Sequence, residues 1–234
     1  MVTLEKNIKG VKSVLTSEDI IVFEFASLSG KKFASIYADG VADKQLLGEL
    51  VAKPLKDVKE DDTLEDIKKR LASPEVKDGD KIADAIKEIS DGNAVLFVDG
   101  EKDFFIIGLK KPPGRTVAEP PTQVAVKGPR EGFTEDIKTN LGLVRKRLKS
   151  DKLQIKTLRA GKQSDTAVAL IFIDGICPDG LAERVQKEIE QKSVDIVPDS
   201  SYISQFISKK PKSLFRHNGS CEKPDIFCAK ISEG

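Results

Sequence analysis

Two Asp-Gly pairs follow apolar, strand-like runs in the two halves of the chain, and their carboxylates are candidates for chemistry. Asp39 comes after Ile-Tyr-Ala, and Asp174 comes after Ile-Phe-Ile. In open α/β sheets, sites gather where strands end, so a carboxylate there can hold a metal ion or act as a base. Asp-Gly is also ordinary turn chemistry, because Asp bonds to the local backbone and Gly adopts a positive φ. Neither half supplies a second catalytic group, so the turn interpretation is favoured.

The loop Gly-Pro-Arg-Glu-Gly-Phe at residues 128–133 is a second candidate. Backbone N–H groups of such a loop can bind an anion at the N-terminus of the following helix. Arg130 can add a bidentate clamp on a carboxylate or phosphate. The loop lacks the spacing of a nucleotide-binding fingerprint. A structural turn that sets the second half against the preceding linker is therefore favoured, with Pro129, Glu131 and Phe133 as ligand or interface residues.

Polar side chains flank the apolar stripe of the helix expected after this loop. The stripe has the spacing of one buried helical face and consists of Ile137, Leu141, Val144 and Leu148. Asn140 and Arg145 lie beside it. Such residues usually form the rim of a core, but they can also line a groove between domains, where small-molecule sites tend to form. Both alternatives stay open at this point.

Cysteine and charge content give little support to a metal site or a nucleic-acid partner. The three cysteines are Cys177, Cys221 and Cys228, and the single histidine, His217, lies near two of them. Their spacing matches no common zinc pattern, and an odd number of cysteines suggests a reducing compartment. The net charge of +1 gives no general attraction to nucleic acid. We expect no metal, no cofactor and no nucleic acid.

Membrane and export signals are also missing from the sequence as read. No stretch reaches the ~18 apolar residues that a membrane-spanning helix needs. The first residues contain no apolar core of a signal peptide. The sequence therefore predicts a soluble piece that is neither embedded in a membrane nor exported by a visible signal.

Periodicity predicts a mixture of helices and hairpins in the first half. The chain begins with helical spacing and continues with a strand, 19–26, that alternates apolar and polar residues and with further strands that pair as hairpins. The expected strands are 19–26, 32–38, 94–98 and 104–109, and the expected helices are 43–52, 63–71 and 81–89. A segment rich in proline, 112–123, is the expected linker, because proline stiffens the chain and cannot donate to a sheet.

The second half repeats part of this pattern. A short apolar run at 124–126 precedes the loop and helix already described. The remaining expected elements are strands at 153–158, 167–173 and 194–197 and helices at 181–191 and 201–208. The apolar run 169–173 is typical of a central strand that is covered on both faces.

Together these elements predict an α/β fold with two tandem, internally repeated subdomains and mixed sheets. The subdomains are residues 1–111 and 124–234. In the first, Ile-Ser-Asp-Gly at 89–92 leads into an apolar strand, whereas its counterpart Ile-Ser-Glu-Gly at 231–234 closes the chain. We therefore expect the second repeat to be truncated at the chain end.

Three motifs resemble a known family. The segment from 119 through the loop at 128–133 and into the helix to 148 is similar to the hallmark of the GerA family, the A subunits of nutrient germinant receptors in endospore-forming bacteria. The run Tyr-Ala-Asp-Gly-Val-Ala-Asp-Lys at 37–44 resembles the family's Tyr-x-Asp-Gly-Leu-Val-Asp-Lys. Cys-Glu-Lys-Pro-Asp at 221–225 resembles its Thr-Glu-Arg-Pro-Asp. The resemblance covers the whole chain.

The resemblance implies the soluble N-terminal region of an integral membrane protein of the spore inner membrane, on its cytoplasmic side. It implies a transporter-like B subunit and a lipoprotein C subunit as partners, with membrane attachment through a C-terminal region missing from this chain. A homo-oligomer of A subunits and a small nutrient are further candidate partners. No enzyme activity is expected.

Two roles follow from the resemblance. In one, the domain contributes to receptor assembly and passes a signal to the membrane part. In the alternative, it binds the germinant directly, at a site between the two subdomains. The sequence does not choose the nutrient.

Overall fold

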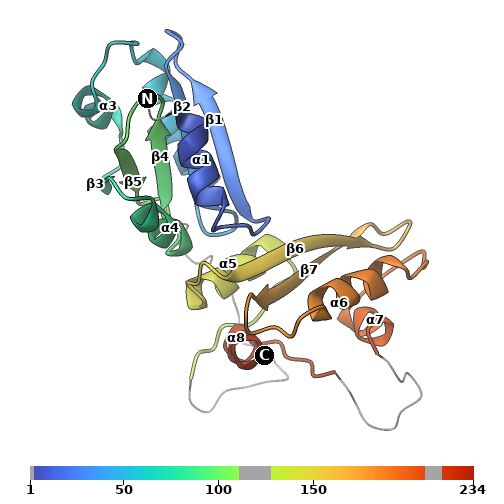
Figure 1. The fold of residues 1–234 in the computed structure, drawn as a ribbon. Coiled ribbons are helices and arrows are strands. Elements are labelled where there is room, and N and C mark those ends of the chain that lie inside the picture. The colour runs from blue at the N-terminus through green and yellow to red at the C-terminus, as the bar shows by residue number, and fades with distance from the viewer. Residues whose placement is uncertain (1–2, 111–127, 209–217) are drawn as a thin grey trace. The chain divides into compact units, whose positions relative to one another are not determined.

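A computed structural model describes residues 3–110, 128–208 and 218–234 of the chain (Figure 1). Contacts divide it into two compact units. Unit 1 contains Met1–Gly114 and Lys138–Lys152, and unit 2 contains Arg115–Ile137 and Leu153–Gly234. The expected linker at 112–123 and the short apolar run at 124–126 lie outside the described residues.

Unit 1 is built around a five-stranded sheet with the order β1-β2-β4-β5-β3. Its strands are β1 (Ile20–Ala26), β2 (Lys32–Ala38), β3 (Val76–Gly79), β4 (Ala94–Val98) and β5 (Phe104–Ile107). All four neighbouring pairs are antiparallel. The expectation of mixed pairing is therefore wrong for this sheet. The reason is β5: β3 and β4 run in the same direction, but β5 is inserted between them.

Helices cover both faces of this sheet, because its central strands are apolar on both faces. One face carries α1 (Leu4–Lys12) and α4 (Ile82–Ser90), which pack on a buried cluster with Ile36, Val95 and Phe97. The other face packs Phe33, Leu96 and Phe105 against the segments from α2 to α3. These segments are α2 (Lys44–Leu47), the π-helical turn η1 (Gly48–Ala52), the 3-10 turn η2 (Pro54–Asp57) and α3 (Leu64–Arg70). Alternate residues of β4 thus enter opposite cores.

Local sequence signals explain where α2 and α3 begin. Thr63 caps α3 by accepting a hydrogen bond from the Asp66 backbone N–H, and the Asp66 carboxylate accepts one from the Thr63 N–H. This is the capping box that the spacing of the two residues predicts. Asp43 caps α2 in the same manner, through the N–H groups of Gln45 and Leu46. The short edge strand β3 has no clear alternation and is not predicted from the sequence.

Unit 2 contains one hairpin with helices beside it. The hairpin joins β6 (Leu153–Ala160) and β7 (Thr166–Ile173) in antiparallel register. The helices are α6 (Leu181–Glu190), α7 (Ser200–Phe206) and α8 (Pro224–Glu233). Side chains of β6, β7, α6 and α7 share one apolar cluster, which includes Leu158, Ile189 and Val197.

Two expectations about unit 2 differ from the structure. Among the described strands, β7 pairs with β6 alone, and most of its residues are half-buried, so it is not a central strand within the described part of the chain. The expected strand at 194–197 is an irregular segment. Its Val194 carbonyl accepts a hydrogen bond from the N–H of Lys162, in the turn between β6 and β7. These local hydrogen bonds to the turn take the place of strand-to-strand hydrogen bonds in a β-sheet.

The order helix, strand, strand occurs in both halves of the chain. It is α1-β1-β2 in the first half and α5 (Ile137–Arg147)-β6-β7 in the second. An Asp-Gly turn with positive φ at Gly40 or Gly175 follows each hairpin. Contacts nevertheless place α5 in unit 1, whereas the division expected from sequence starts the second subdomain at residue 124. The physical reason is a set of contacts that hold α5 in unit 1.

Candidate functional site

Helix α5 brings two of the family-like segments together within unit 1. We call the residues that hold it the α5 seat: Asp19, Asp39, Gly40 and Asp91. The helix buries an apolar face on Leu141, Leu143 and Val144, and it also buries Arg145. A buried arginine at the end of an amphipathic stripe needs a specific partner, because an unpaired charge in the interior is strongly unfavourable.

Asp19 is the partner of Arg145. The arginine Nε donates to Asp19 Oδ2 at 2.7 Å, and Nη2 donates to Asp19 Oδ1 at 2.7 Å. The side chains are 1% and 3% exposed, so water is nearly excluded from the pair. The Ser17 hydroxyl also donates to the Asp19 carboxylate, and Arg145 Nη1 donates to the Ser150 carbonyl at 3.3 Å. This planar, bidentate geometry fixes the direction of the arginine as well as its position.

Two glycines allow the backbone of α5 to approach the turn after β2. A Cβ atom on Gly142 would lie 2.4 Å from the carbonyl oxygen of Gly40. A Cβ atom on Gly40 would lie 2.5 Å from the carbonyl oxygen of Lys138, and Gly40 has a φ of +83°. Both atoms that would be met belong to the backbone, so a side-chain rotation cannot relieve the clash. Glycine is therefore required by packing at both positions, and at Gly40 also by conformation.

Asp39 lies at the rim of the seat and is paired with two lysines. Its carboxylate contacts Lys44 Nζ at 3.0 Å and Lys138 Nζ at 3.6 Å, and it accepts a hydrogen bond from the Gly40 N–H. Partial burial alone would raise the pKa of Asp39. The hydrogen bond and charge of Lys44, the charge of Lys138 and the Gly40 N–H outweigh burial and hold the pKa below its ordinary value.

A further ion pair lies beyond the C-terminal end of α5. Lys149 Nζ lies 3.2 Å from the Asp91 carboxylate, directly after α4. The α5 seat thus combines a buried pair, a close backbone contact and exposed pairs on either side. These groups neutralise and position one another, so the seat is suited to holding a helix and not to acid–base catalysis.

The loop at 128–133 belongs to unit 2 and packs against the start of α8. The Phe133 N–H donates to the Glu222 carbonyl at 2.8 Å, and its ring meets Phe227 edge-on with centroids 5.7 Å apart. Pro129 and Arg130 are exposed, and Glu131 is half-buried. Through Phe133, the loop therefore contacts a second family-like motif, at 221–225, and the helix that follows it.

The remaining candidate residues, Asn140 and Asp174, have different surroundings. Asn140 lies on α5 and is half-buried. Asp174 is exposed, and a Cβ atom added to the following Gly175 would meet nothing within 4 Å. The equivalent turn at Asp39 is covered by α5, so the two Asp-Gly turns share backbone geometry but have different surroundings. Among the candidates, Asp39, Asn140 and Arg145 belong to unit 1, and Asn140 and Arg145 lie on the same helix.

Several residues of α5 and its seat are not singled out by sequence reasoning, among them Asp19, Lys138 and Gly142. A glycine inside a helical pattern is the one signal that can be read beforehand, because such a residue usually has a packing reason. Asp19 gives no such signal, since its role depends on a partner far away in the chain.

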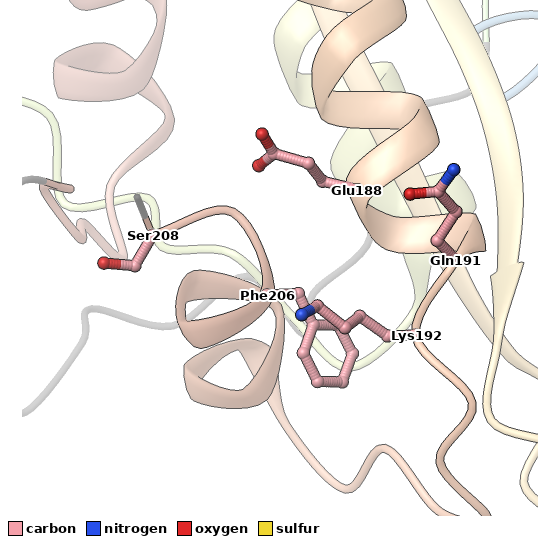
Figure 2. A pocket seen from close by; sticks show the side chains of 5 residues that line it. All are labelled: Glu188, Gln191, Lys192, Phe206 and Ser208. Carbon is pink, nitrogen blue, oxygen red and sulfur yellow. The ribbon is translucent and has the colours of Figure 1, made fainter. Parts of the chain in front are cut away.

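Unit 2 contains a hollow of about 400 Å³ beside α6 and α7. Its lining residues are Glu188, Gln191, Lys192, Phe206 and Ser208. Figure 2 shows that the polar heads of Glu188 and Gln191 point in different directions, and that the Ser208 hydroxyl lies well apart from Lys192. A small-molecule site needs polar groups that converge. This arrangement therefore does not form a preorganised nutrient site.

The described residues contain no group of three or more His, Cys, Asp or Glu side chains that could hold a metal ion. His217 lies outside the described residues. Cys177, Cys221 and Cys228 are free thiols, and burial raises the pKa of Cys221. Within the same described ranges, no helix is long and apolar enough to cross a membrane.

Comparison with known proteins connects this geometry to a family. The family described as Bacillus/Clostridium GerA spore germination protein matches residues 6–234. Spore germination protein KA of Bacillus subtilis (strain 168) is 30% identical, over 99% of this chain and 44% of its own length. Spore germination protein GerQA of Bacillus cereus is 32% identical, over 93% of this chain and 44% of its own length. The chain spans less than half the length of these relatives.

A solved structure shares the fold. It is the crystal structure of the N-terminal domain of the A subunit of the Bacillus megaterium spore germinant receptor GerK3. The TM-score is 0.72 at 24% identity, and the match covers 99% of this chain and 88% of that one. This likeness confirms the α/β fold class expected from the sequence.

Proposed function

The chain belongs to the GerA family of spore germination proteins, and from this premise we propose that it is a domain of a germinant-receptor A subunit. Its role is in receptor assembly and in signal transfer to a membrane part. The receptor acts in the spore inner membrane, with this domain on the cytoplasmic side. Its partners are a transporter-like B subunit, a lipoprotein C subunit and other copies of the A subunit. The domain itself has no enzymatic activity.

The observation that supports this proposal is that Arg145 is paired with Asp19 in the interior of unit 1. A germinant with a carboxylate would need an accessible cationic side chain, and Arg145 is one of the candidates that the sequence offers. Its guanidinium is instead held by Asp19 through two hydrogen bonds of 2.7 Å, away from solvent. The family-like segments thus maintain a packed arrangement, as a scaffold requires. The germinant-binding alternative thereby loses Arg145 as one of its candidate cations.

Titration calorimetry of residues 1–234 tests this proposal. A nutrient of about ten heavy atoms gains at most ~1.5 kcal/mol per atom, and usually far less, unless the site is preorganised. We expect amino acids, sugars and salts to bind with a Kd of about 1 mM or weaker, which corresponds to about −4 kcal/mol. The D-enantiomer of each amino acid serves as control. A saturable one-site isotherm in the micromolar range, absent for the enantiomer, would make the domain the sensor.

A second test uses the full-length receptor in spores. Deletion of residues 1–234 should abolish the germination response, with the B and C subunits still expressed. A receptor that responds normally without this domain would contradict the proposed role.

A further inference from the structure

Helix α5 is held by unit 1, but its neighbours along the chain belong to unit 2. The chain leaves unit 2 after Ile137, passes through unit 1 as Lys138–Lys152, and returns at Leu153. Residues 148–152 alone separate the end of α5 from the start of β6. A displacement of α5 in its seat therefore pulls directly on the first strand of unit 2 through the covalent chain.

The contacts of the α5 seat hold α5 in one well-defined position. The buried Asp19–Arg145 pair has a bidentate geometry, which tolerates little rotation of the helix. The Gly40–Gly142 contact fixes the distance between the turn and the helix, because the two backbones meet without a side chain between them. The exposed pairs Lys138–Asp39 and Lys149–Asp91 add attraction on either side. A closely packed contact of this kind responds to strain by changing between discrete arrangements and not by deforming smoothly.

We propose that α5 is the transmission element between the two units, and that the Gly40–Gly142 contact and the Asp19–Arg145 pair set its signalling position. This inference rests on the proposed role in signal transfer. The inference assigns signal transfer to one helix and to two named contacts. Family membership alone makes no such assignment.

Gly142→Ala is the substitution that displaces α5 most directly. The added methyl group meets the Gly40 carbonyl oxygen at 2.4 Å, so α5 must move away from the turn. Alanine is at the same time a better helix former than glycine, so the helix itself is not weakened. The matched control is Gly48→Ala. Gly48 also has a helical backbone, with φ −62° and ψ −47°, and a Cβ atom there meets nothing within 4 Å.

The experiment places both variants in the full-length receptor in spores. It measures the germinant concentration that gives a half-maximal response, together with receptor abundance by quantitative immunoblot. We expect Gly142→Ala to change the half-maximal concentration at least tenfold while abundance stays within twofold, and Gly48→Ala to match the wild type. Amide exchange of residues 1–234 verifies the perturbation, because α5 amides should exchange faster in Gly142→Ala alone.

Two outcomes would overturn the inference. One is a normal response although α5 amides exchange faster. The other is a response that falls only in proportion to receptor abundance, which would show a role in folding alone. Arg145→Lys provides a second variant, since it keeps the charge and loses the bidentate geometry, and it should shift the response in the same direction. If the deletion of residues 1–234 abolishes germination but these variants do not alter it, the α5 inference fails and the proposed function stands.

Discussion

Arg145 shows how a charged residue can be part of a core. Its side chain is as buried as the apolar residues beside it, yet its Nε and Nη2 groups both donate hydrogen bonds to the Asp19 carboxylate. Such a pair adds modest net stability compared with a well-packed apolar pair, but removal of one partner leaves the other charge buried without compensation. The pair therefore selects one arrangement of α5 more than it stabilises the fold.

Asp19→Asn is the direct test of this interpretation. The variant keeps the shape of the side chain and removes the negative charge that faces Arg145, so the free energy of unfolding should fall by about 3–5 kcal/mol. Urea denaturation measures this change. The control is Glu24→Gln, which neutralises an exposed carboxylate on β1 and should stay within about 0.5 kcal/mol of the wild type. Equal effects of the two variants would show that the Asp19 pair has no special role.

Asp39 predicts a pH dependence of stability with a definite sign. Its pKa in the folded protein is held below the ordinary value of 3.8, chiefly by Lys44 against the opposing effect of burial. A carboxylate of this kind contributes stability that is fully present above its unfolded pKa and is lost as pH falls through the folded pKa. The unfolding free-energy difference between wild type and Asp39→Asn should be constant above about pH 5 and should shrink below about pH 4. Urea denaturation from pH 7 to pH 3 measures it. A difference that grows toward acid pH would contradict the assignment.

At the scale of elements, α2 and α3 begin where the sequence marks them with a capping side chain. Thr63 and Asp66 form their capping box locally, with no contribution from distant residues. The segment after Asp43 starts as an α-helix and continues as a π-helical turn before Pro54, which cannot extend the helix. Gly142, in contrast, is required for a tertiary reason, because a side chain there would meet the backbone of Gly40 in another segment of the chain.

Thr63→Ala should therefore have a local and ordinary effect. Loss of the side-chain acceptor leaves an N–H group at the start of α3 without its partner, which costs about 1 kcal/mol. Thr63→Ser retains the oxygen and should be close to the wild type. Thermal denaturation measures both, and amide exchange should show the change confined to α3. A loss in Thr63→Ser as large as that in Thr63→Ala would indicate that the methyl group, and not the cap, is responsible.

At the scale of the whole molecule, the chain passes between the two units at three places, after residues 114, 137 and 152. The sequence predicts a single crossing at the proline-rich segment. The crossings after residues 137 and 152 flank α5, and this connectivity is the reason for our proposal that α5 transmits a signal between the units.

Much of the secondary structure could be predicted from sequence because its causes are local. Alternation marked β1, apolar runs around an Asp-Gly turn marked β4 and β5, a capping residue marked α3, and an amphipathic stripe marked α5. The failures have tertiary causes. The apolar run in β7 has the composition of a central strand, but strand position depends on partners, and β7 pairs with β6 alone among the described strands.

The sequence by itself determined most of the elements, but not β3 or α8, together with the α/β class and the family, because periodicity, capping and motif spacing depend on neighbouring residues. It also marked Asp39 and Arg145 as unusual, although it left their roles open. Only the tertiary structure decided that Arg145 meets Asp19 and that Gly142 meets Gly40. Those contacts join residues more than a hundred positions apart, and their geometry follows from the path of the backbone and not from any local pattern.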